Sequence, residues 1–303
     1  MKPSPLCPDC SGGAELIGPI PATDFFAGRT LPQPLAGGSL YRCCQCSLGF
    51  RWPRLTKDEL DTLYKGGNEN AWTASSNFRT DWRIAQEWIA RKLPPGSRIL
   101  DVGCFDGGFL EPLGASYRCS GIEIHPSARD RAKRKGIEVI GSDFSEVTGR
   151  FDCITAFDVI EHMERPRAFL DQCLAAIRPH GWALISTGNL DAFTFRMMGS
   201  RYWYCTIAEH ISFLSPAWFG AVTDGQGHQF VKLATFVHGS ASPEQRLREA
   251  ANNFLYRVAP WGFRSLRKLG LGGKPVHTYP ELADHPPGWC SARDHFMVLI
   301  QKS

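Results

Sequence analysis

The segment 98–110 constrains the fold more than any other part of the chain. Residues Arg98–Val102 form a largely apolar run typical of a buried strand, and three glycines follow it within six positions. A strand, a glycine-rich turn and the start of a helix point backbone N–H groups at a small polar ligand. Glu123 closes the next apolar run, 22 positions after Asp101, where an acid can bind the hydroxyls of a ribose. We therefore predict a doubly wound α/β domain that binds a nucleoside-containing cofactor.

The glycine pattern distinguishes between cofactors. The dinucleotide motif G-x-G-x-x-G fails because Phe105 stands at its second glycine. The run instead resembles motif I of the class I S-adenosylmethionine-dependent methyltransferases, in which Asp101, Gly103 and Gly107 match and Phe105 replaces the usual middle glycine. The resemblance continues densely over residues 97–190, in the motif order of the ubiquinone-biosynthesis-like branch. It implies a Rossmann-like, seven-stranded, doubly wound sheet whose last strand is antiparallel.

The same resemblance assigns roles to side chains at the strand ends. In this family Glu123 would bind the ribose hydroxyls, and Asp143 would accept from the adenine amino group. The residues that the resemblance places against the cofactor are Asp101, Gly103, Cys104, Phe105, Gly107, Glu123, Ile124, Asp143, Phe144 and Phe157.

Two C-x-x-C pairs near the N-terminus predict a metal site. Cys7 and Cys10 form one pair, Cys43 and Cys46 the other, and 32 residues separate them. Four thiolates on two tight turns can fill the tetrahedral coordination sphere of a structural Zn²⁺, which leaves Cys44 as the spare thiol. The alternative is a set of free thiols. A redox role would need a thioredoxin-like context, which neither pair has. A zinc ribbon ahead of such a core is similar to sugar and nucleotide-sugar methyltransferases, and this similarity implies a carbohydrate acceptor.

Two histidines are candidates for a general base, because the pKa of imidazole lies near the working pH of most enzymes. His210 follows the predicted fifth strand and is the first choice, and His162 follows the fourth strand and is the second. For each of them the alternative is a hydrogen-bonded structural histidine. Orientation alone can also carry methyl transfer to a good nucleophile.

Composition limits the partners and the setting of the chain. A net charge of +4 is too small to argue for nucleic acid, and no apolar stretch is long enough to span a membrane. Several of the 11 cysteines fall in predicted buried strands, which favours the reducing cytoplasm over a disulfide framework. The basic segment 246–274 has two interpretations: a solvated basic helix, or a contact with a phosphate-bearing or lipid-linked substrate or an anionic membrane surface.

The sequence thus predicts an S-adenosylmethionine-dependent methyltransferase that transfers a methyl group to an oxygen or carbon of a small, sugar-based acceptor. The alternatives are an RNA (tRNA) methyltransferase and a non-catalytic member that only binds the cofactor. The expected organisation is a zinc ribbon (1–52), a helical connector (53–96), the methyltransferase core (97–240), a basic insertion (241–290) and a final edge strand (291–303).

Overall fold

A computed structural model describes residues 5–67, 79–224, 226–237, 241–268 and 285–303. The chain divides into two compact units. The sheet unit comprises Thr73–Gly188, Leu214–Phe236 and His295–Ser303, and the ribbon unit comprises Met1–Trp72, Asn189–Phe213 and Val237–Asp294.

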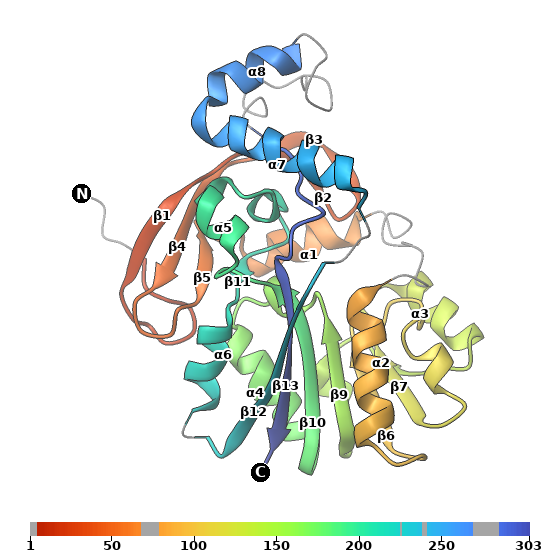
Figure 1. The fold of residues 1–303 in the computed structure, drawn as a ribbon. Helices are drawn as coiled ribbons and strands as arrows, with labels where there is room; N and C mark the ends of the chain where they lie inside the picture. The colour runs from red at the N-terminus through yellow and green to blue at the C-terminus, as the bar shows by residue number, and fades with distance from the viewer. Residues whose placement is uncertain (1–4, 68–78, 225, 238–240, 269–284) are drawn as a thin grey trace. The chain divides into compact units, whose positions relative to one another are not determined.

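The sheet unit contains one seven-stranded sheet with the order β12-β13-β10-β9-β6-β7-β8 (Figure 1). If the seven strands are numbered in chain order and read from the β8 edge, the order is 3-2-1-4-5-7-6. Strand β13 runs antiparallel to both of its neighbours. This confirms the predicted Rossmann-like fold. The strands are β6 (Arg98–Val102), β7 (Arg118–Ile122), β8 (Glu138–Gly141), β9 (Phe151–Phe157), β10 (Ile177–Gly188), β12 (His228–Phe236) and β13 (His295–Lys302).

Helices cover this sheet and explain why its central strands are apolar on both faces. Helix α2 (Thr80–Lys92) buries Ala85, Trp88 and Ile89 in a cluster that includes strand residues of β6, β9, β10 and β13. Proline stands at the start of each of the other three α-helices described in this unit, where its missing N–H costs nothing. These helices are α3 (Pro126–Arg134), α4 (Pro166–Ala176) and α6 (Pro216–Thr223).

Strand β6 lies between β7 and β9, so the chain direction across the sheet reverses at its carboxyl end. Open α/β sheets bind ligands at such a switch point. The glycine turn after β6 therefore lies at the switch point, where the sequence analysis expected the cofactor.

The prediction of a helix directly after that turn is wrong. Between β6 and β7 the structure contains turns and a single 3₁₀ helix, Glu111–Leu113. Pro112 and Gly114 interrupt the segment, and the paired glycines before it are poor helix formers. The turn is closed by hydrogen bonds of its own, because the N–H groups of Gly103 and Cys104 donate to the carbonyl of Ile122 and that of Gly107 donates to the carbonyl of Cys104.

The ribbon unit contains a four-stranded sheet with the order β1-β4-β5-β11 and a hairpin of β2 and β3. Its strands are β1 (Ala14–Ile20), β2 (Thr23–Phe26), β3 (Arg29–Leu35), β4 (Gly38–Cys43), β5 (Gly49–Trp52) and β11 (Ser212–Phe213). Helix α1 (Lys57–Lys65) follows, and its predicted capping box between Thr56 and Glu59 is present.

The edge strand β11 comes from a segment that the sequence analysis placed in the methyltransferase core. Residues Asn189–Phe213, with the short helix α5 (Phe193–Met198), instead belong to the ribbon unit. Arg51 of β5 ties this segment to the ribbon, because its buried guanidinium donates to the carbonyl oxygens of Cys205 (2.7 Å) and Ile207 (3.3 Å). Burial lowers the pKa of Arg51.

The basic insertion forms two helices, α7 (Pro243–Val258) and α8 (Pro260–Lys268). Pro260 separates them, as the sequence suggested. The remainder of the predicted segment, residues 269–284, lies outside the described residues. Among the helices of the described residues, none is both long and apolar enough to cross a membrane.

Candidate functional site

The turn after β6 is shaped by residues with left-handed backbone conformations. Gly103 (φ 75°), Phe105 (φ 46°) and Gly107 (φ 76°) all have positive φ, which costs a non-glycine residue about 1–2 kcal/mol. At Gly103 a Cβ atom would also lie 2.7 Å from Cγ2 of Val159, the second residue after β9. The glycine is therefore required twice, once by conformation and once by close packing.

Glu123 lies just beyond the end of β7 and is bonded to the turn. Its carboxylate, in a residue only 5% exposed, accepts from the backbone N–H of Phe105 (2.9 Å) and of His125 (2.7 Å). Burial raises the pKa of Glu123, and these two N–H groups partly oppose the rise. A carboxylate has about four acceptor positions, so this one can also accept hydroxyl hydrogens of a ribose.

Asp101, near the carboxyl end of β6, is a second buried carboxyl. Its Oδ1 accepts from the hydroxyl of Thr155 at 2.6 Å. Burial raises the pKa of Asp101 to about 7, with smaller upward contributions from Glu123 and Asp81 and a downward one from Arg79. A positive charge placed beside this carboxyl would restore its ionised form.

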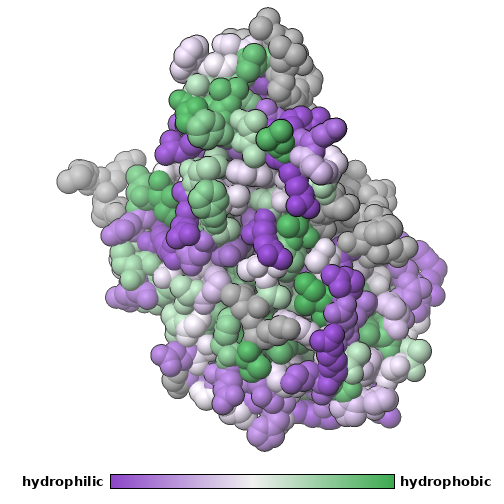
Figure 2. Space-filling view, in the orientation of Figure 1, coloured by the Kyte–Doolittle hydropathy of each residue, from purple (hydrophilic) through white to green (hydrophobic). Residues whose placement is uncertain are grey.

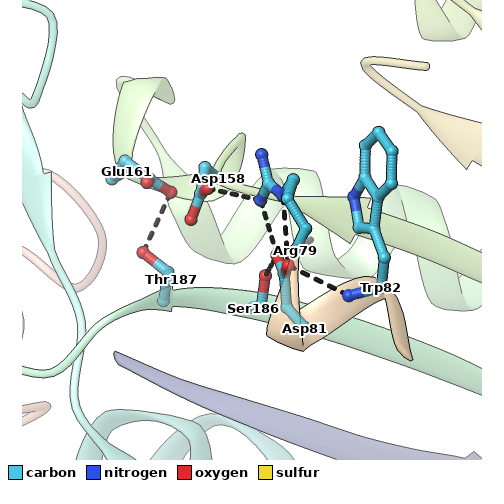
Figure 3. A network of polar contacts seen from close by, with 7 residues as sticks. All are labelled: Arg79, Asp81, Trp82, Asp158, Glu161, Ser186 and Thr187. Carbon is cyan, nitrogen blue, oxygen red and sulfur yellow. Dashed lines mark hydrogen bonds and ion pairs between the residues drawn. The ribbon is translucent and has the colours of Figure 1, made fainter. Parts of the chain in front are cut away.

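A polar network joins the start of α2 to the ends of β9 and β10 (Figure 3). The guanidinium of Arg79 forms ion pairs with Asp81 and with Asp158 (Nη2–Oδ2 2.7 Å), which bridges helix and sheet. Asp81 also accepts from the hydroxyl of Ser186 at 3.2 Å. Burial works against the charge of Arg79, but Asp158 and Asp81 outweigh it and raise the pKa of Arg79.

The charges of the buried side chains in this region test whether the region fits the expected cofactor. Asp81, Asp101, Glu123 and Glu161 are all at most 5% exposed, and Asp81 is ion-paired with the guanidinium of Arg79. Buried carboxylates need compensating charge. S-adenosylmethionine carries a sulfonium and an ammonium group, so the residues present fit a cationic nucleoside of this kind.

The other predicted cofactor residues occupy different surroundings. Phe157 is buried and packs edge-to-face on Phe109, with ring centroids 4.6 Å apart. Cys104 is buried, and Gly121 provides the space for its side chain. Ile124 is 58% exposed, and the ring of Phe105 lies against the guanidinium of Arg131 at 5.0 Å.

Asp143 follows β8, as predicted, and caps a 3₁₀ helix that begins at Phe144. Its Oδ1 accepts from the backbone N–H of Ser145 at 2.8 Å. The Phe144 ring contacts Phe169 of α4, with a centroid separation of 6.5 Å. The structure thus brings Asp101, Gly103 and Glu123 together, and places Asp143 at the end of the neighbouring strand.

The two candidate bases lie in different units. His162 ends the 3₁₀ helix Ile160–His162 of the sheet unit and is half-buried. His210 belongs to the ribbon unit, is 7% exposed, and has Nδ1 at 3.1 Å from the carbonyl oxygen of Tyr204. Because a carbonyl only accepts, Nδ1 carries the hydrogen of the neutral ring and Nε2 is the basic nitrogen.

The four predicted ligand cysteines converge in the ribbon unit. All four sulfur atoms lie within 4.8 Å of one another. The Sγ–Sγ distances are 3.6 Å for Cys7–Cys46, 3.4 Å for Cys10–Cys43 and 3.6 Å for Cys10–Cys46. Tetrahedral Zn²⁺ with bonds of about 2.3 Å requires sulfur separations of about 3.8 Å, so the cluster fits this metal.

The two C-x-x-C turns have the same backbone design. Ser11 and Ser47, each four residues after the first cysteine of its pair, have φ of 58° and 63°. Each donates its N–H to the carbonyl of that first cysteine, at 2.9 Å and 3.2 Å. Cys43 Sγ also accepts from the N–H groups of Gln45 and Cys46, both at 3.4 Å.

Taken together, the turn at the switch point and the buried carboxyl groups of Asp101 and Glu123 fit a Rossmann-like protein that binds a cationic nucleoside cofactor. Residues 79–232, about half of the chain, match the family model described as a methyltransferase domain. The chain therefore belongs to this methyltransferase family, and S-adenosylmethionine is its methyl donor.

The chain is similar to two curated methyltransferases and to one solved structure. The chain is 27% identical over 200 residues to a ubiquinone biosynthesis O-methyltransferase of Xanthomonas axonopodis pv. citri, an alignment that covers 58% of this chain and 82% of the relative. It is 24% identical over 209 residues to the protein of the same name in Thiobacillus denitrificans, over 62% of this chain and 90% of the relative. A solved magnesium protoporphyrin IX methyltransferase of Synechocystis with bound S-adenosylhomocysteine aligns at 12% identity and a TM-score of 0.46, over 73% of this chain and 82% of that one.

Sequence reasoning missed the Arg79 network. The polar residues Arg79, Asp81, Asp158 and Ser186 are separated by up to 107 positions and carry no local motif. One signal was available, because Asp158 directly follows β9, at the end where parallel strands present ligand groups. That Asp158 meets Arg79 at the start of α2 could only be seen in the fold.

Proposed function

We propose that this methyltransferase methylates a hydroxyl oxygen of a small acceptor. The observation that carries the proposal is the pair of buried carboxyl groups, Asp101 and Glu123, which suits a cationic nucleoside cofactor at the switch point of the sheet. The O-methyltransferase names of the relatives support oxygen as the atom methylated.

The chain's own residues would bind and orient rather than react. S-adenosylmethionine supplies an electrophilic methyl group on its sulfonium. Glu123 would hold the ribose hydroxyls, Asp143 would accept from the adenine amino group, and Asp101 would offset positive charge. Arg79 would keep Asp81 and Asp158 fixed, so that the carboxylates do not have to reorganise when the cofactor binds.

A general base is needed if the acceptor hydroxyl has a high pKa, and we propose His210 for this role. The support is its ring orientation, in which Nδ1 lies 3.1 Å from the carbonyl oxygen of Tyr204, so that the neutral ring carries its hydrogen on Nδ1. His162, half-buried at the end of the 3₁₀ helix after β9, is the second choice.

For the acceptor we retain a carbohydrate or nucleotide sugar, in a cytoplasmic setting. The support is the cluster of four cysteines in the ribbon unit, since the combination of ribbon and core gave this prediction from sequence. The relatives instead bear a name that refers to ubiquinone biosynthesis, which makes a phenolic acceptor the comparison to test. These names favour neither RNA modification nor a non-catalytic member.

The first experiment is titration calorimetry with S-adenosylmethionine and S-adenosylhomocysteine. Glu123→Gln should weaken binding of both by about 1–3 kcal/mol, because a charged acceptor of ribose hydrogen bonds is lost. Glu138→Gln is the matched control, since Glu138 begins β8, at the end of that strand away from the switch point. Equal affinities for the two variants would contradict the assignment of Glu123.

The second experiment identifies the acceptor. Formation of S-adenosylhomocysteine is measured with a panel of nucleotide sugars, free sugars and catechols, and the methylated atom is located by NMR. Turnover with a sugar hydroxyl supports the proposal. Turnover with catechols alone would overturn the carbohydrate acceptor but keep O-methylation, and methylation of carbon or nitrogen would overturn O-methylation itself.

A further inference from the structure

Helix α7 has two faces that differ in their surroundings. On the inner face, Glu249 accepts from the backbone N–H (2.9 Å) and hydroxyl (2.6 Å) of Ser291, and Asn253 donates to the carbonyl of Gly288 at 3.2 Å. Tyr256 is buried and packs on Phe263 of α8, with ring centroids 5.5 Å apart. These contacts hold the helix in the ribbon unit without any help from its outer face.

The outer face is an apolar stripe exposed to solvent. Leu247, Ala251, Phe254 and Val258 follow one another at spacings of four, three and four residues, which places them on one side of a helix. Leu247 is 73% exposed, Phe254 60% and Val258 57%, and Trp261 at the start of α8 is 75% exposed. Figure 2 shows hydrophobic side chains beside hydrophilic ones on the surface over α7 and α8.

Arginines border the stripe on both sides. Arg248 follows Leu247 on one flank, and Arg246 and Arg257 lie on the other, all three exposed. Over residues 243–268 the sequence holds six basic and two acidic side chains. The resulting charge of +4 equals the net charge of the entire chain, so the excess positive charge is concentrated here.

We propose that this outer face of α7 and α8 binds the surface of an anionic membrane. A second copy of the chain is the poorer occupant, because pairing the stripes would set Arg248 and Arg257 against the same arginines of the other copy. An anionic lipid surface neutralises them instead. The helix of 16 residues is about 24 Å long, has its aliphatic and aromatic side chains on one face and arginines at the borders, and thus matches helices that lie in the membrane interface.

Aromatic side chains strengthen this choice. Helices that lie in the membrane interface carry Trp, Phe and Leu on their apolar face, and Trp261 and Phe254 are the two most exposed aromatic residues of the two helices. The proposal is independent of the methyl-transfer reaction and of the acceptor.

The test is co-sedimentation of the full chain with lipid vesicles. We expect binding to phosphatidylcholine vesicles that contain phosphatidylglycerol, little binding to phosphatidylcholine alone, and weaker binding as salt rises. Phe254→Ser/Trp261→Ser should reduce the affinity at least about tenfold, since two large apolar side chains no longer enter the interface. Phe193→Ser is the matched control, because Phe193 is 72% exposed on α5, outside this face.

Circular dichroism and zinc content should be the same for all of these proteins, because the changed side chains are largely exposed. Arg248→Glu provides a second route to the same answer and should also weaken binding to anionic vesicles. The proposal is overturned by equal binding of the wild type and the double variant, or by no binding to anionic vesicles. A concentration-dependent dimer that the double variant abolishes would overturn it too, and would identify the face as an interface between copies.

Discussion

Replacing Asp101 by asparagine should stabilise the ligand-free protein, and increasingly so as the pH rises. The pKa of Asp101 is raised from about 3.8 to about 7 by burial. At pH 6 the folded state holds the proton while the unfolded chain has released it. Above pH 7 the folded state must bury a charged carboxylate. The free energy of unfolding of the wild type therefore falls as the pH increases towards 7 and levels off above it, because over this range the folded state binds more protons than the unfolded one.

The size of the effect follows from the shift. A difference of about three pKa units corresponds to about 4 kcal/mol when both states are ionised, of which about 1.4 kcal/mol develops between pH 6 and pH 8.5. Asparagine keeps an oxygen that can accept from Thr155 but cannot ionise. The stability of Asp101→Asn relative to wild type should thus rise by about 1–1.5 kcal/mol over this interval.

The assay is urea unfolding of both proteins at pH 6.0, 7.0 and 8.5, without cofactor, followed on the transition of the sheet unit. Asp171→Asn serves as the matched control, because Asp171 is exposed on α4 and its loss reports the effect of one surface carboxylate. A stability difference between Asp101→Asn and wild type that does not change with pH would refute the reasoning. The same variant should bind S-adenosylmethionine less tightly and S-adenosylhomocysteine nearly as well, since only the former carries a sulfonium charge.

Three further predictions concern the metal, the turn and the base. Cys10→Ser should release zinc and unfold the ribbon, whereas Cys44→Ser should keep one zinc per chain by metal analysis; equal zinc contents would contradict the ligand assignment. Gly103→Ala should lower the free energy of unfolding by at least about 1 kcal/mol because of its positive φ and a Cβ position 2.7 Å from a neighbouring side chain, and an unchanged urea midpoint would argue against this. His210→Ala should reduce kcat by about 10²–10⁴-fold with cofactor affinity retained, while His162→Ala should not; small equal losses would indicate transfer by alignment alone.

Local sequence was sufficient to predict several elements of the fold. Arg98–Val102 is the strand that the apolar run predicted, the capping box at Thr56 is formed, and Pro260 separates α7 from α8. These features depend on neighbours within a few residues, where propensity and turn chemistry act directly. The helix expected after the glycine turn does not form for a local reason as well, since Gly107, Gly108 and Pro112 disfavour helix.

By itself the sequence determined the class of the protein, because the strand-turn pattern at Asp101–Gly107 and the order of the motifs after it are features of the methyltransferase family that lie in local sequence. Tertiary structure decided which distant groups meet. It brought Asp158, at the end of β9, to Arg79 at the start of α2, raised the pKa of Asp101 through burial, and joined residues 189–213 to the ribbon unit through Arg51. Burial and long-range pairing depend on the whole packed chain, and no window of sequence contains them.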